Sequence, residues 1–166
     1  MRYRGLADVA LVTNDMEKTV RFYRDVLGIS VVVTFARDIN GQRIRHYFFR
    51  LGPASCLSFF EGPGVELPPR KDAGVPAAGR QFDHVTIGVD SEKTLMDLQK
   101  RVRKAGVQPS DIVDHGFARA MYFEDPNGIS LGFAVYTQDL EVEPAFYDSQ
   151  PVPPLRQTPF KEKRSE

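Results

Sequence analysis

The sequence predicts an α+β fold of two βαβββ modules that form a curved mixed sheet around a cleft. Two observations support this fold. A shift of 76 positions carries Asp8–Val12 onto His84–Gly88, and both segments alternate in hydrophobicity as strands do. Each segment is followed by the pattern of an amphipathic helix and then by three more strand-like runs. The chain is therefore predicted to contain two copies of one structural unit.

The first module is expected to open with a strand over 6–13 and a helix over 16–27. Asn14 can cap this helix, and Glu17, three positions later, completes the pattern of a capping box. Gly28 supplies the left-handed residue that ends many helices. One apolar stripe should be buried, and it consists of Met16, Val20, Tyr23 and Leu27.

Three strands should follow, over 29–35, 43–50 and 55–61. The first two are joined by Asn40-Gly41, a dipeptide typical of hairpin turns. In the third strand, alternation places Cys56, Ser58 and Phe60 on one face and Leu57, Phe59 and Glu61 on the other. The face with the larger apolar pair, Leu57 and Phe59, is expected to pack against the helix.

The second module is expected to repeat the order, with a strand over 83–89 and a helix over 92–105. Asp90 is the matching capping residue and Gly106 the matching stop. The buried stripe of this helix should comprise Leu95, Leu98, Val102 and Ala105. Three strands should complete the module, and they cover 107–113, 119–124 and 129–136, with a turn at Asp125-Pro126-Asn127-Gly128 before the last.

The remaining segments are rich in proline. Residues 63–81 carry four prolines and are predicted to be a linker, whereas 137–166 form a proline-rich C-terminal arm. The domain organisation is therefore a first module at 1–62, the linker, a second module at 82–136, and the arm.

The strand faces opposite the helices carry mostly small side chains, which predicts a ligand-sized cleft between curved sheets; the alternative is tight packing of another layer. Asp8 and His84 occupy equivalent positions on these faces. The other members are Ala10, Cys56, Ser58, Thr86, Gly88, Ser130, Gly132 and Ala134.

Composition excludes several classes of partner. Twenty-two basic residues balance 22 acidic ones, so no net charge attracts nucleic acid or an anionic membrane. The chain has one cysteine, Cys56, which fits a reducing compartment, and we expect a cytoplasmic protein. The first twenty residues lack the long apolar run of a signal peptide or membrane span.

Four motifs in the right order resemble the vicinal oxygen chelate superfamily. They are residues 9–28, Arg45-His46-Tyr47-Phe48-Phe49, Phe82-Asp83-His84-Val85 and Tyr122-Phe123-Glu124-Asp125-Pro126-Asn127-Gly128. The superfamily includes glyoxalase I, extradiol ring-cleavage dioxygenases, methylmalonyl-CoA epimerase, fosfomycin-resistance enzymes and bleomycin-binding proteins. The resemblance covers residues 5–136 and implies paired βαβββ modules around a cleft, usually with a divalent metal ion.

The resemblance places the metal-ligand positions at Asp8, Ser58, His84 and Gly132. His84 is a usual ligand, but Asp8 stands where His is common and Gly132 where Glu is common. Asp8 and His84 are thus the expected metal ligands, and they are fewer than the three that a catalytic ion generally needs. Glu61 should point to the other face of its strand and is not favoured as a third ligand. The expected cofactor is one divalent ion (iron, manganese or zinc) or none.

The resemblance also implies roles for other residues. His115 and Tyr122 are similar to a His and Tyr pair that assists proton transfer in extradiol enzymes, so they are the catalytic candidates. The candidates for substrate binding are His46, Phe48, Ser58, Thr86 and Arg119. For each histidine, a structural role in the cleft wall or at the surface is the alternative.

Two functions stay open at this point. One is a metal-dependent dioxygenase or lyase that acts on an aromatic diol or another oxygen-bearing small molecule. The other is a metal-free protein that binds or sequesters a ligand, as bleomycin-resistance proteins do. We expect a homodimer in either case, and the sequence does not decide whether the two modules pair within one chain or swap between two.

Overall fold

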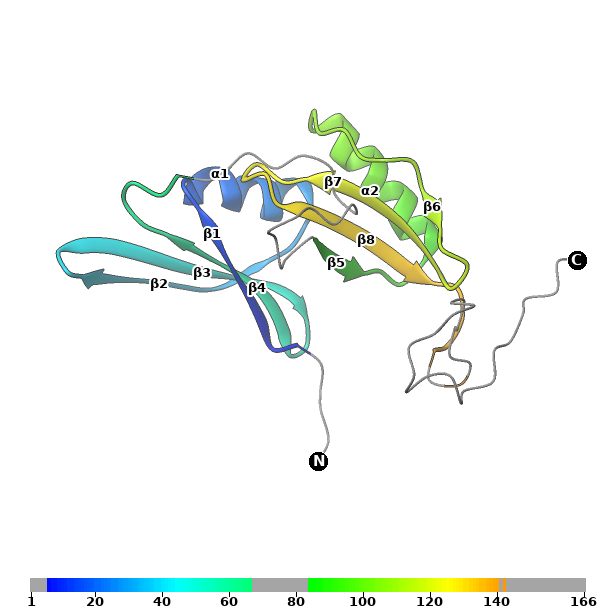
Figure 1. Cartoon of the computed structure of the whole chain (residues 1–166), viewed down its shortest axis with the longest axis horizontal. Coiled ribbons are helices and arrows are strands. Elements are labelled where there is room, and N and C mark those ends of the chain that lie inside the picture. Colours follow the sequence, from blue (N-terminus) through cyan, green and yellow to red (C-terminus); the bar gives the residue numbers. More distant parts are fainter. Residues whose placement is uncertain (1–5, 67–83, 141, 143–166) are drawn as a thin grey trace, which may run out of the picture.

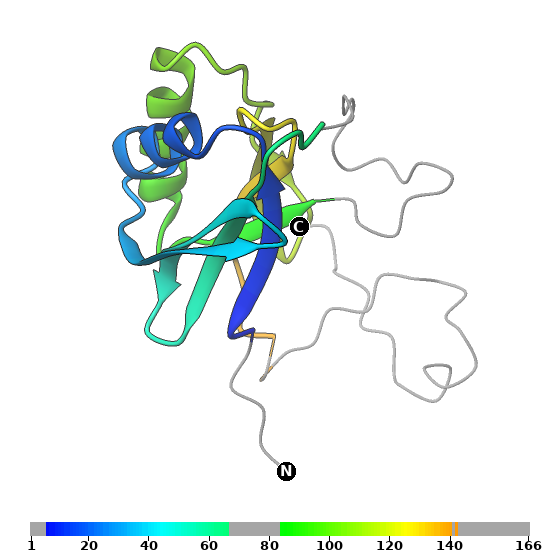
Figure 2. The ribbon, with the colours of Figure 1, turned by 90° about the vertical axis from the view of Figure 1, so that its left-hand side faces the viewer.

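Two separate four-stranded sheets form the fold, and the helices lie on the same side of both (Figures 1 and 2). The computed structural model describes residues 6–66, 84–140 and 142. Sheet A has the strand order β1-β4-β3-β2, and sheet B has β5-β8-β7-β6. In each sheet the first two strands of this order are parallel and the others antiparallel. The predicted α+β fold of two βαβββ modules is confirmed.

The elements of the first module are β1 (Asp8–Thr13), α1 (Met16–Val20), a π-helical turn η1 (Arg21–Val26), β2 (Val31–Ile39), β3 (Gln42–Gly52) and β4 (Ser55–Glu61). Those of the second are β5 (Val85–Gly88), α2 (Glu92–Lys104), β6 (Val113–Asp114), β7 (Ala118–Glu124) and β8 (Ser130–Tyr136). We call the face of each sheet that packs on the helices the helix face, and the opposite one the open face.

The helix caps lie one residue later than expected. Asp15, not Asn14, caps α1 by accepting a hydrogen bond from the Lys18 N–H, at 2.9 Å. With this cap, Glu17 is no longer at the capping-box position, and it pairs with Arg21. Likewise Ser91, not Asp90, caps α2. In each pair both neighbours are good capping residues, so local sequence does not separate them.

The first helix does not stay α-helical to its end. After Val20 it widens into η1, in which the Leu27 N–H donates to the Phe22 carbonyl at 3.1 Å. Phe22 and Tyr23 are both buried there, although they are neighbours in sequence. Phe22 contacts Phe123 of the second module, with ring centroids 6.3 Å apart. The first helix therefore packs against both modules.

One hydrophobic core between the helices and the helix faces serves both modules. The predicted assignment of the β4 faces is confirmed, because Leu57 and Phe59 are fully buried there. Much of the predicted stripe of the first helix is also buried, and Val20 packs against the core as a partly buried neighbour. The core residues of that helix are Met16, Phe22, Tyr23 and Leu27, and those of α2 are Leu95, Leu98 and Val102.

The strand expected over 107–113 is wrong in extent, because β6 comprises only Val113–Asp114. Ser110 nevertheless lies beside β7. Its N–H donates to the Tyr122 carbonyl at 2.8 Å, and its side-chain oxygen accepts from the Tyr122 N–H at 3.0 Å. A side chain thus replaces one backbone partner, and the regular ladder ends there.

A buried polar network joins the modules through the Asp125–Gly128 turn. Asp125 accepts hydrogen bonds from the Tyr23 hydroxyl at 3.0 Å and from the Asn127 and Ile129 N–H groups, both at 2.8 Å. The Asn127 side chain reaches Thr13 at 2.7 Å and Thr19 at 3.2 Å. Burial raises the pKa of the Asp125 carboxyl, and these hydrogen bonds oppose that rise. The turn therefore connects the modules as well as two strands.

The two modules form separate sheets that are not closed around a common cleft, because β1 and β5 belong to different sheets (Figure 1). Apart from 63–66, the predicted linker lies outside the described residues, and so does the predicted arm apart from 137–140 and 142. In the described part of the chain, no helix has the length and apolar character needed to cross a membrane.

Candidate functional site

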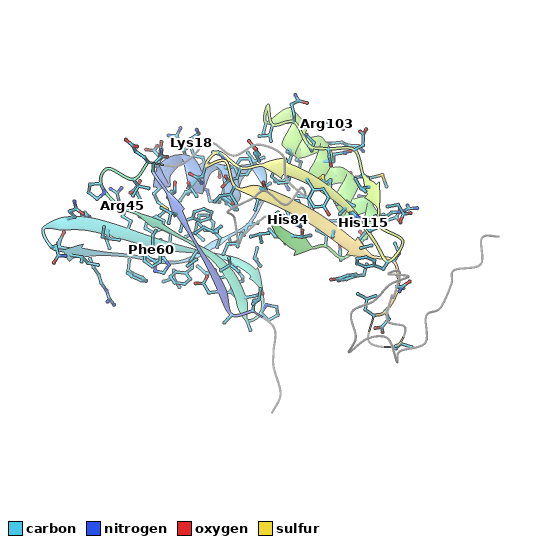
Figure 3. The ribbon with its side chains drawn as sticks, in the orientation of Figure 1. Lys18, Arg45, Phe60, His84, Arg103 and His115 are labelled. Carbon is cyan, nitrogen blue, oxygen red and sulfur yellow. The ribbon has the colours of Figure 1, made fainter. Side chains whose placement is uncertain are left out.

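Tyr122 lies at the centre of a polar group on the open face of sheet B. Its hydroxyl is 3.1 Å from Nε2 of His115, which lies in the loop between β6 and β7. Its ring contacts the ring of His84, just before β5, edge-on at a centroid distance of 5.3 Å. Figure 3 shows His84 and His115 on this sheet. Three side chains that can transfer or share protons thus come together from three segments.

Local structure explains this arrangement. In β7, alternation sends Met121 and Phe123 into the core and Tyr122 to the open face. His115 is held by a tight loop, in which its N–H donates to the Ala118 carbonyl at 2.8 Å. Gly116 follows with a φ of 82°, a conformation that favours glycine, and its N–H donates to Asp114 at 2.7 Å. The loop fixes the position of the His115 backbone.

Burial raises the pKa of Tyr122, so its phenol is protonated at neutral pH. A phenol donates one hydrogen bond and also accepts, and a neutral imidazole nitrogen does either, depending on its tautomer. When His115 Nε2 carries the proton and donates to the phenol oxygen, the Tyr122 proton is available to a ligand. The pair can therefore present a hydrogen-bond donor to an oxygen atom.

The open face of sheet A carries a second group. The Ser58 hydroxyl donates to Asp8 at 3.0 Å. His46 is 7% exposed, and its ring stacks on Phe60 with centroids 3.6 Å apart and lies 4.3 Å from that of Phe48. Its Nε2 is buried and has no hydrogen-bond partner among the described residues. Burial lowers the pKa of His46, and the charge of Asp8 opposes this shift.

The predicted site residues thus fall into two groups. Asp8, His46, Phe48 and Ser58 are on sheet A, and His84, Thr86, His115 and Tyr122 are on sheet B or beside its strands. Figure 3 shows the separation, with Phe60 on sheet A and His84 on sheet B. Arg119 joins neither group. It lies on the helix face, where its guanidinium pairs with Glu92 at 2.8 Å and Asp114 at 3.6 Å.

The residues present do not fit the divalent ion that the resemblance implies. The described residues contain no group of three or more His, Cys, Asp or Glu side chains that could hold a metal ion. Glu61 is occupied on the helix face, where it accepts from the Met16 N–H at 2.6 Å and pairs with Arg45. Gly132 offers no side chain. Within the part of one chain that the structure describes, the ligand set that a catalytic ion needs is therefore not brought together.

Three hollows of about 310 to 360 Å³ lie away from Tyr122. The first, between α2 and β7, is lined by Glu92, Asp114 and Arg119 among others. The other two lie near α1 and share Arg45. None of the three is lined by Asp8, His84 or Tyr122, so they do not form part of the candidate site.

Two residues of the site have roles that the sequence did not predict. Phe60 was expected on this face together with Ser58, but its stacking on His46 was not expected. Gly132 was considered only as a metal-ligand position, whereas in the structure it pairs with both Thr86 and Tyr122 across the sheet. That role has no local signal, because it depends on how closely two neighbouring strands bring their side chains together.

Comparison with known proteins gives two ring-cleaving relatives. The chain is 29% identical over 133 residues to biphenyl-2,3-diol 1,2-dioxygenase 3 of Rhodococcus globerulus, covering 74% of this chain and 58% of the relative. It is 28% identical over 131 residues to the putative ring-cleaving dioxygenase MhqA of Bacillus subtilis (strain 168), covering 76% and 38%. The chain thus spans less than two thirds of either relative.

A solved structure with the same fold is a mutant form of the fosfomycin resistance protein FosX from Listeria monocytogenes, complexed with Mn(II) and 1S,2S-dihydroxypropylphosphonic acid. Its TM-score is 0.59 at 19% identity, covering 85% of this chain and 98% of that one. The model of the Glyoxalase/Bleomycin resistance protein/Dioxygenase superfamily matches residues 5–133. The chain therefore belongs to the Glyoxalase/Bleomycin resistance protein/Dioxygenase superfamily.

Proposed function

We propose that this protein binds a small molecule through an oxygen atom on the open face of sheet B, at the centre formed by His84, His115 and Tyr122. The observation that carries the proposal is the 3.1 Å contact between His115 Nε2 and the Tyr122 hydroxyl. The raised pKa of Tyr122 keeps the phenol protonated and able to donate. A phenolic, carbonyl or carboxylate oxygen is the matching acceptor.

The names of the two curated relatives suggest aromatic diols as the first compounds to test. Biphenyl-2,3-diol and catechol carry adjacent phenolic oxygens, and benzoate supplies a carboxylate on a similar ring. Calorimetric titration of each compound into the untagged protein, without oxygen, would identify the preferred acceptor. Failure of all three to bind at millimolar concentration would contradict the proposal for aromatic ligands.

Replacing Tyr122 with phenylalanine is expected to weaken binding of the best of these compounds about tenfold, because the ring stays and the donated hydrogen bond is lost. Calorimetry measures the dissociation constant. Tyr47→Phe is the matched control, since Tyr47 pairs with Phe59 on the helix face of sheet A. Equal affinities for Tyr122→Phe and the wild type would show that the phenol does not contact the ligand.

A second candidate is ring cleavage, favoured by the names of both relatives and by the suitability of a His and Tyr pair for proton transfer. This activity would need an added metal ion. Asp8 and His84 are the proposed ligands, and because they lie on separate sheets of one chain, two copies would have to supply them together. Oxygen uptake by the protein with biphenyl-2,3-diol and Fe(II) or Mn(II) would establish it. Binding of the diol without oxygen uptake would leave ligand binding as the function.

We also propose that two copies associate through their open faces, with sheet A of one on sheet B of the other. Sheet A exposes large side chains there, including Phe35 (38% exposed) and Phe60 (39%). Sheet B offers small ones, among them Thr86, Gly88, Gly132 and Ala134. Large residues facing small ones would bury apolar surface that a single chain leaves in water.

Phe60→Asp is expected to raise the dissociation constant of this dimer by about tenfold or more, since a charge would replace an apolar anchor at the interface. Sedimentation velocity over a range of concentrations measures the change. Met96→Asp is the control, because Met96 is similarly exposed, at 43%, but belongs to α2, which lies on the opposite side of sheet B from the open face. An unchanged sedimentation profile for Phe60→Asp would exclude this mode of association.

A further inference from the structure

We infer that the Tyr122 ring occupies the space on sheet B that a third metal ligand would need, and that the site binds its ligand without a metal ion. Gly132 is the positioning residue, because its lack of a side chain leaves room for this ring. The inference rests on the proposed function, because it assumes that the open face of sheet B holds the ligand. The close packing around Gly132 would explain why no metal ligand stands at position 132, and the position of the Tyr122 ring would depend on this glycine.

Gly132 lies between two side chains. In β8 it is directly opposite Thr86 of the parallel strand β5 and Tyr122 of the antiparallel strand β7. A Cβ atom built on Gly132 would be 2.8 Å from the Thr86 Oγ1 and 3.0 Å from both Cδ1 and Cε1 of Tyr122. The distance to Thr86 is shorter than Cβ contacts in real structures, and the two distances to Tyr122 are tighter than most, so Thr86 or the Tyr122 ring would have to shift to admit a side chain.

Backbone conformation does not explain this glycine. Gly132 is absent from the glycines with positive φ, whereas Gly28, Gly106 and Gly128 are among them. Any residue could adopt its extended conformation in the middle of a strand. The close approach of Thr86 and of the Tyr122 ring is therefore the reason for glycine, as expected where a strand has to admit neighbouring groups.

The Tyr122 ring then fixes the two histidines around it. His84 contacts the ring at 5.3 Å, and His115 contacts the hydroxyl at 3.1 Å. A carboxylate at position 132 would require Thr86 and the ring to shift, and a shift of the ring would change both contacts. The described residues offer no group of three His, Cys, Asp or Glu side chains that could hold a metal ion. The ligand consistent with this arrangement is one whose oxygen accepts from a protonated phenol, and a chelated ion is not required.

The test compares Gly132→Ala with Gly88→Ala. Both glycines are on the open face of sheet B with ordinary φ, but a Cβ at Gly88 would meet no atom within 4 Å. The chain has three histidines, so their imidazole C–H signals are readily assigned in proton NMR spectra of untagged protein. Gly132→Ala should shift the His84 and His115 signals and weaken binding of the preferred aromatic compound about tenfold. Gly88→Ala should do neither.

Two further measurements keep the outcomes distinguishable. Tyr122→Phe should leave the His84 signal nearly unchanged, because the ring remains, and shift that of His115. Adding Thr86→Ala to Gly132→Ala removes the nearest clashing atom and should restore part of the affinity.

If Gly132→Ala matches the wild type in both spectrum and affinity while Tyr122→Phe still weakens binding, Gly132 does not position Tyr122 and the proposed function stands. If Tyr122→Phe also binds normally, the proposed function fails with it.

Metal binding is tested on the wild type, whose folding is not in question. Elemental analysis after dialysis against Mn(II), Fe(II) or Zn(II) should show far less than one equivalent of each. Titration with Mn(II), which is paramagnetic, should not selectively broaden the His84 signal. One equivalent of metal, with His84 broadened and the metal lost in His84→Ala, would overturn the inference.

Discussion

Asp125→Ala is expected to lower the free energy of unfolding by about 3 to 5 kcal/mol, because it leaves several buried donors without an acceptor, each costing about 1 kcal/mol or more. These donors are the Tyr23 hydroxyl, the Asn127 and Ile129 N–H groups and the Asn127 side-chain amide. Urea unfolding followed by far-ultraviolet circular dichroism measures the change, since the chain has no tryptophan. A loss of this size is a large fraction of the stability of a typical domain.

The control for this variant is Asp111→Ala, because the Asp111 side chain is fully exposed. Tyr23→Phe removes one of the donors and should cost about 1 to 2 kcal/mol. In the double variant the two losses should not add, because both act on the same hydrogen bond. A loss below about 1 kcal/mol for Asp125→Ala, or full additivity with Tyr23→Phe, would show that the turn does not connect the modules.

His46→Phe is expected to raise the free energy of unfolding by about 1 to 3 kcal/mol at pH 7, the cost of a buried polar group without a partner. Its Nε2 is such a group among the described residues. Phenylalanine has a similar shape and would keep the stacking on Phe60 and Phe48. His46→Gln, which leaves a buried polar group, is the control and should bring no gain.

The gain should grow on acidification. Burial lowers the pKa of His46 in the native state, whereas in the unfolded chain it titrates near 6.5. As the pH falls below about 6.5, the unfolded state takes up a proton and the native state does not, so the wild type loses stability until the lowered pKa is reached. The Phe variant lacks this loss. A wild type more stable than His46→Phe at pH 7 would mean that Nε2 gains a partner in the assembled protein.

Most of the fold could be predicted from local patterns. The two repeats, the helix stripes and the β4 faces depend on spacings of two and of three or four residues, which the sequence displays directly. The errors are also local in origin. Asn14 and Asp15 are both good caps. The run 107–113 begins and ends with β-branched residues, which favour strands, but it contains Pro109, which is rare inside them. Its pairing with β7 is limited to Val113–Asp114, and Ser110 supplies a side-chain partner instead.

The candidate site could be predicted only in part. Alternation and the family resemblance pointed to His84, His115 and Tyr122, and the structure brings these three together. Arg119 was expected to contact a substrate, yet it pairs with Glu92 on the other face. Arg119 lies three positions before Tyr122 in β7, so alternation sends it to the opposite face, where it meets an acidic residue from a distant segment.

By itself, the sequence determined that the chain holds two copies of one unit, because hydrophobic spacing within a dozen residues sets each strand and helix. Only the tertiary structure decided that Asp125 accepts a hydrogen bond from Tyr23 across the modules. It also decided that the groups around Asp8 and Tyr122 lie on separate sheets, and that the Tyr122 ring packs closely against Gly132. Those outcomes depend on atoms from strands and turns distant in sequence meeting at van der Waals or hydrogen-bond distance, which no local pattern encodes.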